Sequence, residues 1–264
     1  MTSFDEVPPR LMAAFRRAEH ILWDFDGPLV TLFAQPDDAS DAYLPLLVAD
    51  EFRVMLEKCG LPVGPFEGSR DPYGTYQSVG ARGAEAGDEA TVSELLRRMR
   101  DRLDRLDEQA ALTATLTDGA DELVKELAEQ GKRLAVASNN ATKAIEACLR
   151  RADLANGTLI GCFSGRIVGR LDHPAKMKPN PECLYQAMEC LREGSGGPVA
   201  PASCLMIGDS QADALAAARA GIPFCGYAPD AGKRRALTAV GARDDMIATN
   251  LAACAAALGR LVRA

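Results

Sequence analysis

The chain lacks an excess of basic residues, a long apolar run and any closely paired cysteines, and each absence excludes a class of protein. Its 264 residues include 37 acidic and 30 basic side chains, which give a formal net charge of −7. Nucleic acids and anionic membranes attract basic surfaces and repel an acidic one, so neither is expected as a partner. We expect a small molecule instead, and an anionic one would need a local cation.

Long hydrophobic stretches are also missing. The alanine-rich segment from Leu251 to Val262 is too short for a membrane span and is interrupted by Gly259 and Arg260. The N-terminal residues contain acids and prolines where a secretory signal needs a basic start and an apolar run. We therefore expect a soluble, cytoplasmic protein without membrane association.

The cysteines form no C-x-x-C pair, which excludes the common zinc and dithiol redox motifs. Each stands in an apolar or helical context, where cysteine behaves as a small hydrophobe. We expect buried or partly buried free thiols rather than ligands or disulfides, and this suits a reducing compartment. The eight are Cys59, Cys148, Cys162, Cys183, Cys190, Cys204, Cys225 and Cys254.

Short apolar runs alternate with helical patterns from Thr117 onward, which predicts an α/β fold. The first strand of the chain is predicted at His20–Phe25, a branched and aromatic run that ends in Asp, Gly and Pro. Strands separated by helices of this length predict parallel crossover units and a doubly wound sheet with helices on both faces. The further strands are predicted within KRLAVASNN, CFSGRIVG, SCLMIGDS, IPFCGYA and MIAT.

Residues 34–116 contain no comparable strand and are predicted to be an insertion. Helical periodicity is present in 43–59 and again in 89–111, whereas the Gly-rich, polar stretch 60–87 is predicted to be a loop. At this length, a core with a smaller inserted domain is a natural expectation. We therefore predict a core formed by 1–33 and 117–264, with a helical cap domain at 34–116.

Polar residues follow three of the predicted strands at the point where each ends. In a doubly wound sheet the ligand binds at the carboxyl ends of the strands, so these residues are expected at one edge. They are Asp24 and Asp26, then Ser138, Asn139 and Asn140, then Asp209 and Ser210.

Asp24 and Asp26 are spaced i and i+2, which on a strand places both side chains on the same side, about 6–7 Å apart. Their repulsion is relieved either by a raised pKa or by a bound cation. Asp209 would add the hard oxygen ligands that Mg²⁺ prefers, and Asp213 is a further candidate. The alternative is that the first pair merely caps the turn before Gly27.

Lys178, within KMKPNP, could neutralise an attacking carboxylate and a bound phosphate together. Alone, such a lysine is more often a solvated surface charge, and Lys176 is a competing candidate at similar spacing. Ser138 and Asn139 could donate a hydroxyl and an amide to phosphoryl oxygens. The alternative for this pair is N-capping of the helix that follows.

These motifs together resemble the haloacid dehalogenase-like superfamily in its phosphatase branch. The four characteristic motifs occur in order, on the expected strand ends, and span most of the chain. They are DFDGPLV at Asp24–Val30, VASNN ending at Ser138–Asn140, KPNP at Lys178–Pro181 and GDSQAD at Gly208–Asp213.

The resemblance implies a Rossmann-like core, a helical cap that chooses the substrate, and a Mg²⁺ cofactor. It implies Asp24 as the nucleophile that forms an aspartyl-phosphate, and Asp26 as acid to the leaving group and then base to water. Ser138 and Lys178 would bind the phosphate. The dehalogenases of the superfamily lack an acid at the position of Asp26, so this residue favours phosphoryl transfer over carbon–halogen cleavage.

The metal site implied by the resemblance consists of Asp24, Asp209 and the main-chain carbonyl of Asp26, with Asp213 as a ligand or an orienting residue. One position departs from the family pattern. Pro28 stands where Thr or Val is more usual, and proline fixes φ and removes an amide donor, so we expect a stiffer turn.

The favoured function is hydrolysis of a small phosphorylated metabolite, as in the phosphoglycolate phosphatases that the chain resembles. One alternative is a phosphomutase of the β-phosphoglucomutase type, because the same core can return the phosphoryl group to a sugar. Another is a binding protein without turnover, suggested only by Pro28. The sequence leaves the substrate and the oligomeric state open.

Overall fold

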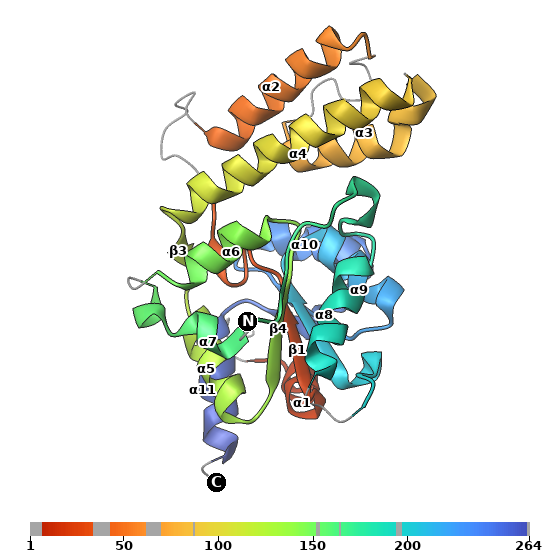
Figure 1. Cartoon of the computed structure of the whole chain (residues 1–264). Helices are drawn as coiled ribbons and strands as arrows, with labels where there is room; N and C mark the ends of the chain where they lie inside the picture. The colour runs from red at the N-terminus through yellow and green to blue at the C-terminus, as the bar shows by residue number, and fades with distance from the viewer. Residues whose placement is uncertain are drawn as a thin grey trace.

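A computed structural model of the chain describes residues 7–33, 43–61, 70–86, 88–151, 154–163, 165–193 and 197–262. A sheet flanked by helices forms one part of the molecule, and three further helices lie beyond the edge of that sheet (Figure 1). The functional residues predicted from the sequence lie where these two parts meet.

The sheet contains six parallel strands in the order β5-β4-β1-β6-β7-β8. Parallel neighbours need crossover connections, and helices supply them, as the alternating pattern predicted. The doubly wound α/β fold is therefore confirmed. The strands are β1 (His20–Trp23), β4 (Arg133–Ala137), β5 (Ile167–Val168), β6 (Cys204–Gly208), β7 (Phe224–Tyr227) and β8 (Ile247–Ala248).

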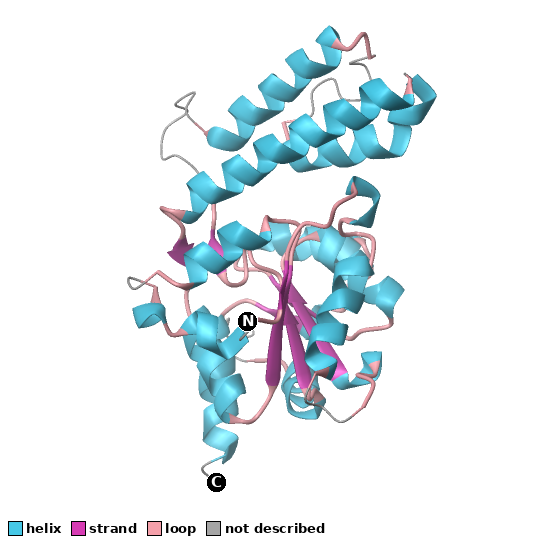
Figure 2. Cartoon of the chain, viewed as in Figure 1, coloured by secondary structure: helices cyan, strands magenta, loops and turns pink. Residues whose placement is uncertain are grey.

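Helices cover both faces of the sheet (Figure 2). Alternation along β1 contributes side chains to a separate hydrophobic cluster on each face. Ile21 and Trp23 of β1 belong to one cluster, whereas Leu22 between them belongs to the other. On the first face pack α1 (Pro9–Arg17), α5 (Ala120–Glu129), α6 (Thr142–Leu149), α7 (Leu159–Phe163) and α11 (Leu251–Val262). On the second face pack α8 (Glu182–Arg192) and α9 (Gln211–Ala220), with α10 (Ala231–Ala239) beside α9 and β7.

Short 3₁₀ helices at Ala155–Gly157, Pro174–Lys176, Pro201–Ser203 and Asp244–Met246 complete the core connections. All eight cysteines are free thiols, five of them buried and three partly buried, as predicted. Among the described residues, no helix combines the length and the apolar character needed to cross a membrane.

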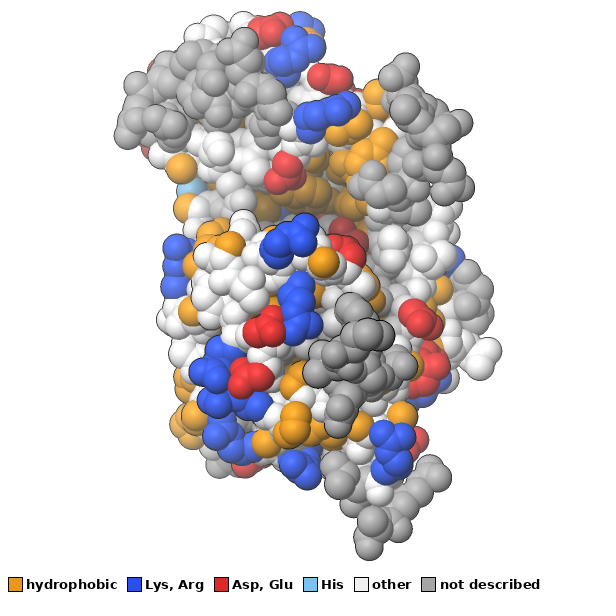
Figure 3. Space-filling view, turned by 180° about the vertical axis from the view of Figure 1, so that it is seen from behind, with side chains coloured by type: hydrophobic (Ala, Val, Ile, Leu, Met, Phe, Trp, Pro, Cys, Tyr) orange, Lys and Arg blue, Asp and Glu red, His pale blue; other side chains and the backbone are white. Residues whose placement is uncertain are grey.

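Three helices, α2 (Leu44–Lys58), α3 (Pro72–Ala86) and α4 (Glu89–Ala111), form what we call the helical layer. They bury their own hydrophobic cluster, which includes Phe52, Tyr76 and Met99. A two-stranded antiparallel sheet of β2 (Val30–Thr31) and β3 (Thr115–Leu116) joins the layer to the core. Seen from behind, the surface is hollowed between layer and core, and hydrophobic side chains line the hollow (Figure 3). The exact domain boundaries stay a prediction.

The prediction of a loop throughout 60–87 was wrong for residues 72–86, which form α3. The side chain of Asp71 accepts hydrogen bonds from the first amides of the helix, and Tyr76 and Val79 are buried on its inner face. Gly80 permits close packing, because a Cβ there would lie 2.2 Å from the Pro174 ring. Gly80, one of the glycines that suggested a loop, thus serves helix packing. Residues 62–69 and 87 lie outside the described residues.

Candidate active site

The site lies at the carboxyl ends of β1 and β6, the two central strands of the sheet. The chain proceeds from β1 to β4 and β5 on one side, and β6, β7 and β8 follow on the other side. This reversal is the topological switch point, where open α/β sheets bind their ligands. Asp24 follows β1 directly and Asp209 follows β6, so the pairing of these strands brings the two carboxylates together.

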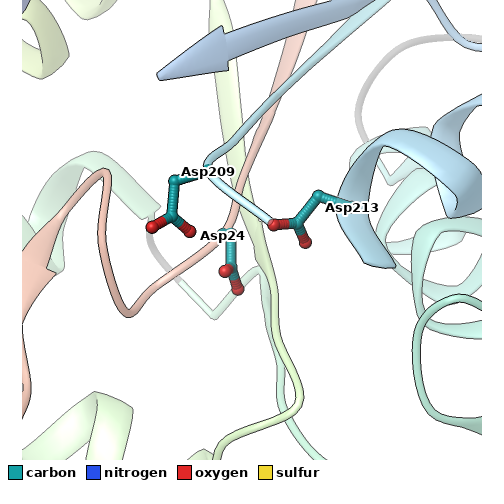
Figure 4. A group of neighbouring side chains, drawn as sticks. All are labelled: Asp24, Asp209 and Asp213. Carbon is teal, nitrogen blue, oxygen red and sulfur yellow. The ribbon is translucent and has the colours of Figure 1, made fainter. Parts of the chain in front are cut away.

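Three carboxylates gather at this edge. Oxygens of Asp24, Asp209 and Asp213 lie within 4.8 Å of one another (Figure 4). Asp24 and Asp213 are 8% and 0% exposed. Asp213 is held in place by a capping box at the start of α9, in which Ser210 Oγ accepts a hydrogen bond from the Asp213 amide and Asp213 Oδ2 accepts one from the Ser210 amide. The sequence D-S-x-x-D after β6 therefore fixes this part of the cluster locally.

Lys178 supplies the countercharge. Its Nζ donates to Asp24 Oδ1 at 2.7 Å, to Asp213 Oδ1 at 2.5 Å and to the Ala137 carbonyl at 2.9 Å. The residue is 2% exposed, and a buried ammonium requires such partners. Lys176, the competing candidate, is exposed on a 3₁₀ helix. The structure thus places Lys178 in the site.

Ser138 and Asn139 follow β4 at the same edge. Ser138 is 1% exposed, and Asn139 makes two hydrogen bonds to the main chain of Lys178, at 2.9 Å to its amide and 3.1 Å to its carbonyl. The pair does not cap the following helix, because the N-cap of α6 is Ala141. Asn139 therefore holds the segment that presents Lys178.

Asp26 lies on a turn beside the cluster but outside the group of three carboxylates. Its Oδ1 accepts a hydrogen bond of 2.9 Å from the amide of Leu32 at the end of β2. The next residue, Gly27, has φ +108°, and a Cβ there would lie 2.3 Å from Cγ of Asp209. Glycine is therefore required for the turn and the Asp209 carboxylate to occupy neighbouring space.

The turn that contains Pro28 is closed by main-chain hydrogen bonds of other residues. The Gly27 amide donates to the Val30 carbonyl at 2.7 Å, and the Val30 amide donates to the Phe25 carbonyl at 3.1 Å. The amide that Pro28 lacks is not one of these donors, so the proline is compatible with the turn.

Burial and charge crowding shift the protonation equilibria of the site. Burial raises the pKa of Asp24 to about 7, repulsion from Asp213 adds to the rise, and Lys178 opposes it. Burial likewise raises the pKa of Asp26 to about 6 against an opposing main-chain hydrogen bond. Burial and Asp213 raise the pKa of Asp209 above its ordinary value. Burial alone would lower the pKa of Lys178, but the Asp213 and Asp24 carboxylates raise it.

Lys233 is a site residue that the sequence patterns did not indicate. It lies in the first turn of α10, and its Nζ donates to Asp209 Oδ2. Its place in the sequence could have indicated this role, because it follows the end of the predicted strand IPFCGYA by five residues, at the same edge of the sheet. Two ammonium groups therefore face the three carboxylates, so the formal charge of the described cluster is −1 when all three carboxylates are ionised.

The carboxylates suit a hard divalent cation such as Mg²⁺, which prefers oxygen ligands and shares its coordination with waters and phosphate. Both oxygens of Asp213 are already bonded, one to Lys178 and the other to Ser210. Asp24 accepts a hydrogen bond from Lys178 through Oδ1, and Asp209 accepts one from Lys233 through Oδ2. The arrangement therefore fits a site in which Asp24 and Asp209 are ligands and Asp213 orients Lys178.

A cavity of about 550 Å³ extends from the carboxylates toward the helical layer. It is the described cavity that contains all the predicted site residues. On the core side it is lined by Asp24, Asp26, Gly27, Thr117, Ser138, Asn139, Asn140, Lys178, Asp209, Ser210, Asp213, Tyr227, Pro229 and Lys233, and on the side of the helical layer by Thr31, Phe33, Tyr43, Asp71 and Tyr73.

The sequence model of the haloacid dehalogenase-like hydrolases matches residues 18–221. The chain belongs to this family. The resemblance drawn from the four motifs is thereby confirmed, and so is the expectation of a hydrolase with a Rossmann-like core. No curated protein matches the chain.

Solved structures share the fold of this haloacid dehalogenase-like hydrolase. A predicted phosphatase from Clostridium acetobutylicum is 18% identical, with 94% of this chain and 99% of that chain covered and a TM-score of 0.57. A predicted phosphoglycolate phosphatase from Haemophilus somnus is 21% identical, with coverage of 89% and 96% and a TM-score of 0.51. A family hydrolase from Deinococcus radiodurans R1, with bound phosphate and sodium, is 21% identical, with coverage of 97% and 97% and a TM-score of 0.52.

A buried polar network joins the helical layer of this hydrolase to the turn after β4. Asp107 of α4 is 0% exposed and accepts from Asn140 Nδ2 at 3.0 Å, the Ala141 amide at 2.8 Å and Arg170 Nη2 at 2.7 Å. The Tyr73 hydroxyl donates to the same carboxylate. Sequence reasoning missed this network, although an acid within the apolar stripe of α4 was a signal. The network fixes the helical layer against the turn after β4.

Proposed function

We propose that the chain is a Mg²⁺-dependent phosphatase that hydrolyses a small phosphorylated metabolite through an aspartyl-phosphate on Asp24. The observation that supports this best is the buried Lys178, which bridges Asp24 and Asp213 beside Asp209 at the switch point of the sheet. The bound phosphate in the Deinococcus structure and the two neighbours described as predicted phosphatases agree with this reaction class.

In the first step, an oxygen of Asp24 attacks the phosphorus and the bond from phosphorus to the ester oxygen breaks. Asp26, whose pKa is raised by burial to about 6, gives its proton to the leaving oxygen. Lys178 keeps its positive charge beside the attacking carboxylate and neutralises the charge on the phosphoryl oxygens. The products of this step are an alcohol and the aspartyl-phosphate.

In the second step, Asp26 as carboxylate takes a proton from water, whose oxygen attacks the phosphorus. The bond between phosphorus and the Asp24 oxygen breaks, which restores the carboxylate and releases inorganic phosphate. The proton returns Asp26 to its starting state. The same residue thus serves as acid and then as base, for which a pKa near neutrality is suited.

Asp24, Asp209 and the main-chain carbonyl of Asp26 would hold the Mg²⁺, with Asp213 orienting Lys178. The ion supplies charge neutralisation for the phosphoryl oxygens when bound. Ser138, Asn139 and Lys178 are assigned to the phosphate side of the cavity, in the loops after β4 and β5. The helical layer, within residues 34–116, would act as the cap over the site.

The test is release of inorganic phosphate from p-nitrophenyl phosphate and a panel of phosphorylated metabolites, with Mg²⁺ and after its removal by EDTA. Asp24→Asn should lower kcat/KM at least about a thousandfold, as expected for loss of a nucleophile. Asp172→Asn is the matched control, because that carboxylate is exposed and pairs only with Arg100 among its described contacts. A phosphorylated peptide containing Asp24 should appear after acid quench of the wild type.

Two outcomes separate the alternatives. Isomerisation of a sugar phosphate without net phosphate release would replace the proposal with a phosphomutase. A stable phosphorylated protein that never turns over would instead indicate a binding protein. Full activity of Asp24→Asn would remove this residue as the nucleophile.

A further inference from the structure

The cations that line the cavity are confined to its core side. Among the described lining residues these are Lys178 and Lys233, and both are bonded to the carboxylates of the cluster. The end of the cavity against the helical layer, where the leaving group of a phosphate ester would lie, has no basic lining residue in the described part of the chain. A second anionic group on the substrate would therefore lack a cationic partner among the described residues there.

The lining of that end is aromatic and acidic. Phe33, Tyr43 and Tyr73 contribute rings, and Asp71 contributes an exposed carboxylate. Burial and the neighbouring Asp26 raise the pKa of Tyr43, so its phenol stays protonated. Phenol rings pack against the carbon atoms of a ligand and attract cations to their faces, whereas they do not neutralise an anion.

The first main-chain amides of a helix can bind an anion, but at the start of α3 these amides already donate hydrogen bonds to Asp71. Asp71 accepts hydrogen bonds from the Tyr73 amide at 2.9 Å and the Gly74 amide at 3.0 Å. The Thr75 amide donates to the main-chain carbonyl of Asp71 at 3.0 Å. An anionic ligand would meet the negative charge of Asp71 instead of the positive end of the helix.

The two described arginines nearest to this end of the cavity do not supply a cation to its lining. Arg170 lies 5.7 Å from the centre of the Tyr73 ring, but its side chain is 1% exposed and is paired with Asp104 and Asp107. Arg70 is exposed and does not line the cavity. Of the stretches of the layer whose side chains lie outside the described residues, 34–42 and 62–69 contain no Lys, Arg or His, and 82–87 contains Arg82.

We propose that the natural substrate is a phosphomonoester whose leaving group carries no negative charge, such as a polyol, an amino alcohol or another neutral or cationic alcohol. This inference rests on the proposed phosphatase function. It predicts discrimination against phosphorylated carboxylic acids, because their carboxylate would lie near the carboxylate of Asp71 with no cation among the described lining residues at that end.

A matched set of two-carbon esters tests the inference directly. 2-Phosphoglycolate, 2-hydroxyethyl phosphate and O-phosphoethanolamine differ at one end, which is a carboxylate, a hydroxymethyl or an aminomethyl group. With purified full-length protein and Mg²⁺, kcat/KM for the neutral and cationic esters should exceed that for phosphoglycolate by about tenfold or more, because like charges disfavour each other at short range.

Asp71→Asn sharpens the test, because asparagine also caps helices while it removes the charge. The variant should reduce the discrimination against phosphoglycolate at least about threefold, whereas Asp172→Asn should retain the wild-type ratios. Equal or higher kcat/KM for phosphoglycolate in the wild type would overturn the inference and leave the phosphatase proposal intact. Absence of phosphate release from every ester would refute the phosphatase proposal, and the inference with it.

Discussion

The contact between Asp107 and Arg170 provides a sharp test of the energetics that join the two parts of the molecule. Arg170 Nη2 donates to Asp107 Oδ2 and to Asp104 Oδ1, and both distances are 2.7 Å. The side chains of Asp107 and Asp104 are 0% and 36% exposed. The same guanidinium nitrogen therefore makes one fully buried and one partly solvated ion pair of equal length.

The burial of each carboxylate decides how much its substitution should lower the free energy of unfolding. Removing one partner of a buried ion pair leaves an uncompensated charge and costs about 3–5 kcal/mol. Asp107→Asn should fall near the lower end, about 3 kcal/mol, because the amide keeps one acceptor oxygen for the other donors. Asp104→Asn should cost about 1 kcal/mol, because solvent reaches and screens the partly exposed Asp104 carboxylate, and Arg170 keeps Asp107 as its partner. The two similar substitutions should therefore differ by about 2 kcal/mol.

Urea denaturation followed by far-ultraviolet circular dichroism and by fluorescence of the single tryptophan measures these costs. That residue, Trp23, is buried in β1 and reports on the core. A double-mutant cycle of Asp107→Asn with Arg170→Met should show a coupling of about 1–3 kcal/mol, with the double variant less destabilised than the sum. Equal losses for the substitutions at 104 and 107, or additivity of the cycle, would refute this account of the network.

Two further predictions concern the active-site turn and acid stability. Gly27→Ala should lower kcat/KM about a hundredfold, because the new Cβ would displace the Asp209 carboxylate. Gly131 also has a positive φ but has open space around it, so Gly131→Ala should lower only the stability of the protein. Unchanged activity of Gly27→Ala would contradict the close approach. Burial lowers the pKa of His20, so the unfolded chain binds the proton more readily, and the contribution of His20 to the free energy of unfolding should fall as pH drops below about 6.5, whereas the raised pKa values of Asp24 and Asp26 act in the opposite direction. Relative to the wild type, the urea midpoint of His20→Leu should therefore be shifted in the stabilising direction on going from pH 7.5 to 5.5, whereas the exposed His173→Gln should show the same pH dependence as the wild type.

The sequence by itself determined the class of fold and the sheet edge at which the candidate site lies. Short apolar runs and the helical patterns between them are local properties, so the parallel sheet followed from them. Asp24, Ser138 and Asp209 each end a buried strand, and parallel strands place such ends at one edge. The same local reasoning failed for α3, because close packing of Gly80 against Pro174 is a long-range contact that composition does not show.

Only the tertiary structure decided which of the charged side chains meet. Lys178 and Asp24 are 154 positions apart, and local sequence did not distinguish Lys178 from Lys176. Lys233 reaches Asp209, and Asp107 enters the buried network, through contacts between separate elements. The aromatic and acidic lining opposite the phosphate side likewise depends on how the helical layer packs on the core. Side-chain pairing across elements depends on the assembled fold, since the distances that govern charge interactions are set by packing and not by spacing along the chain.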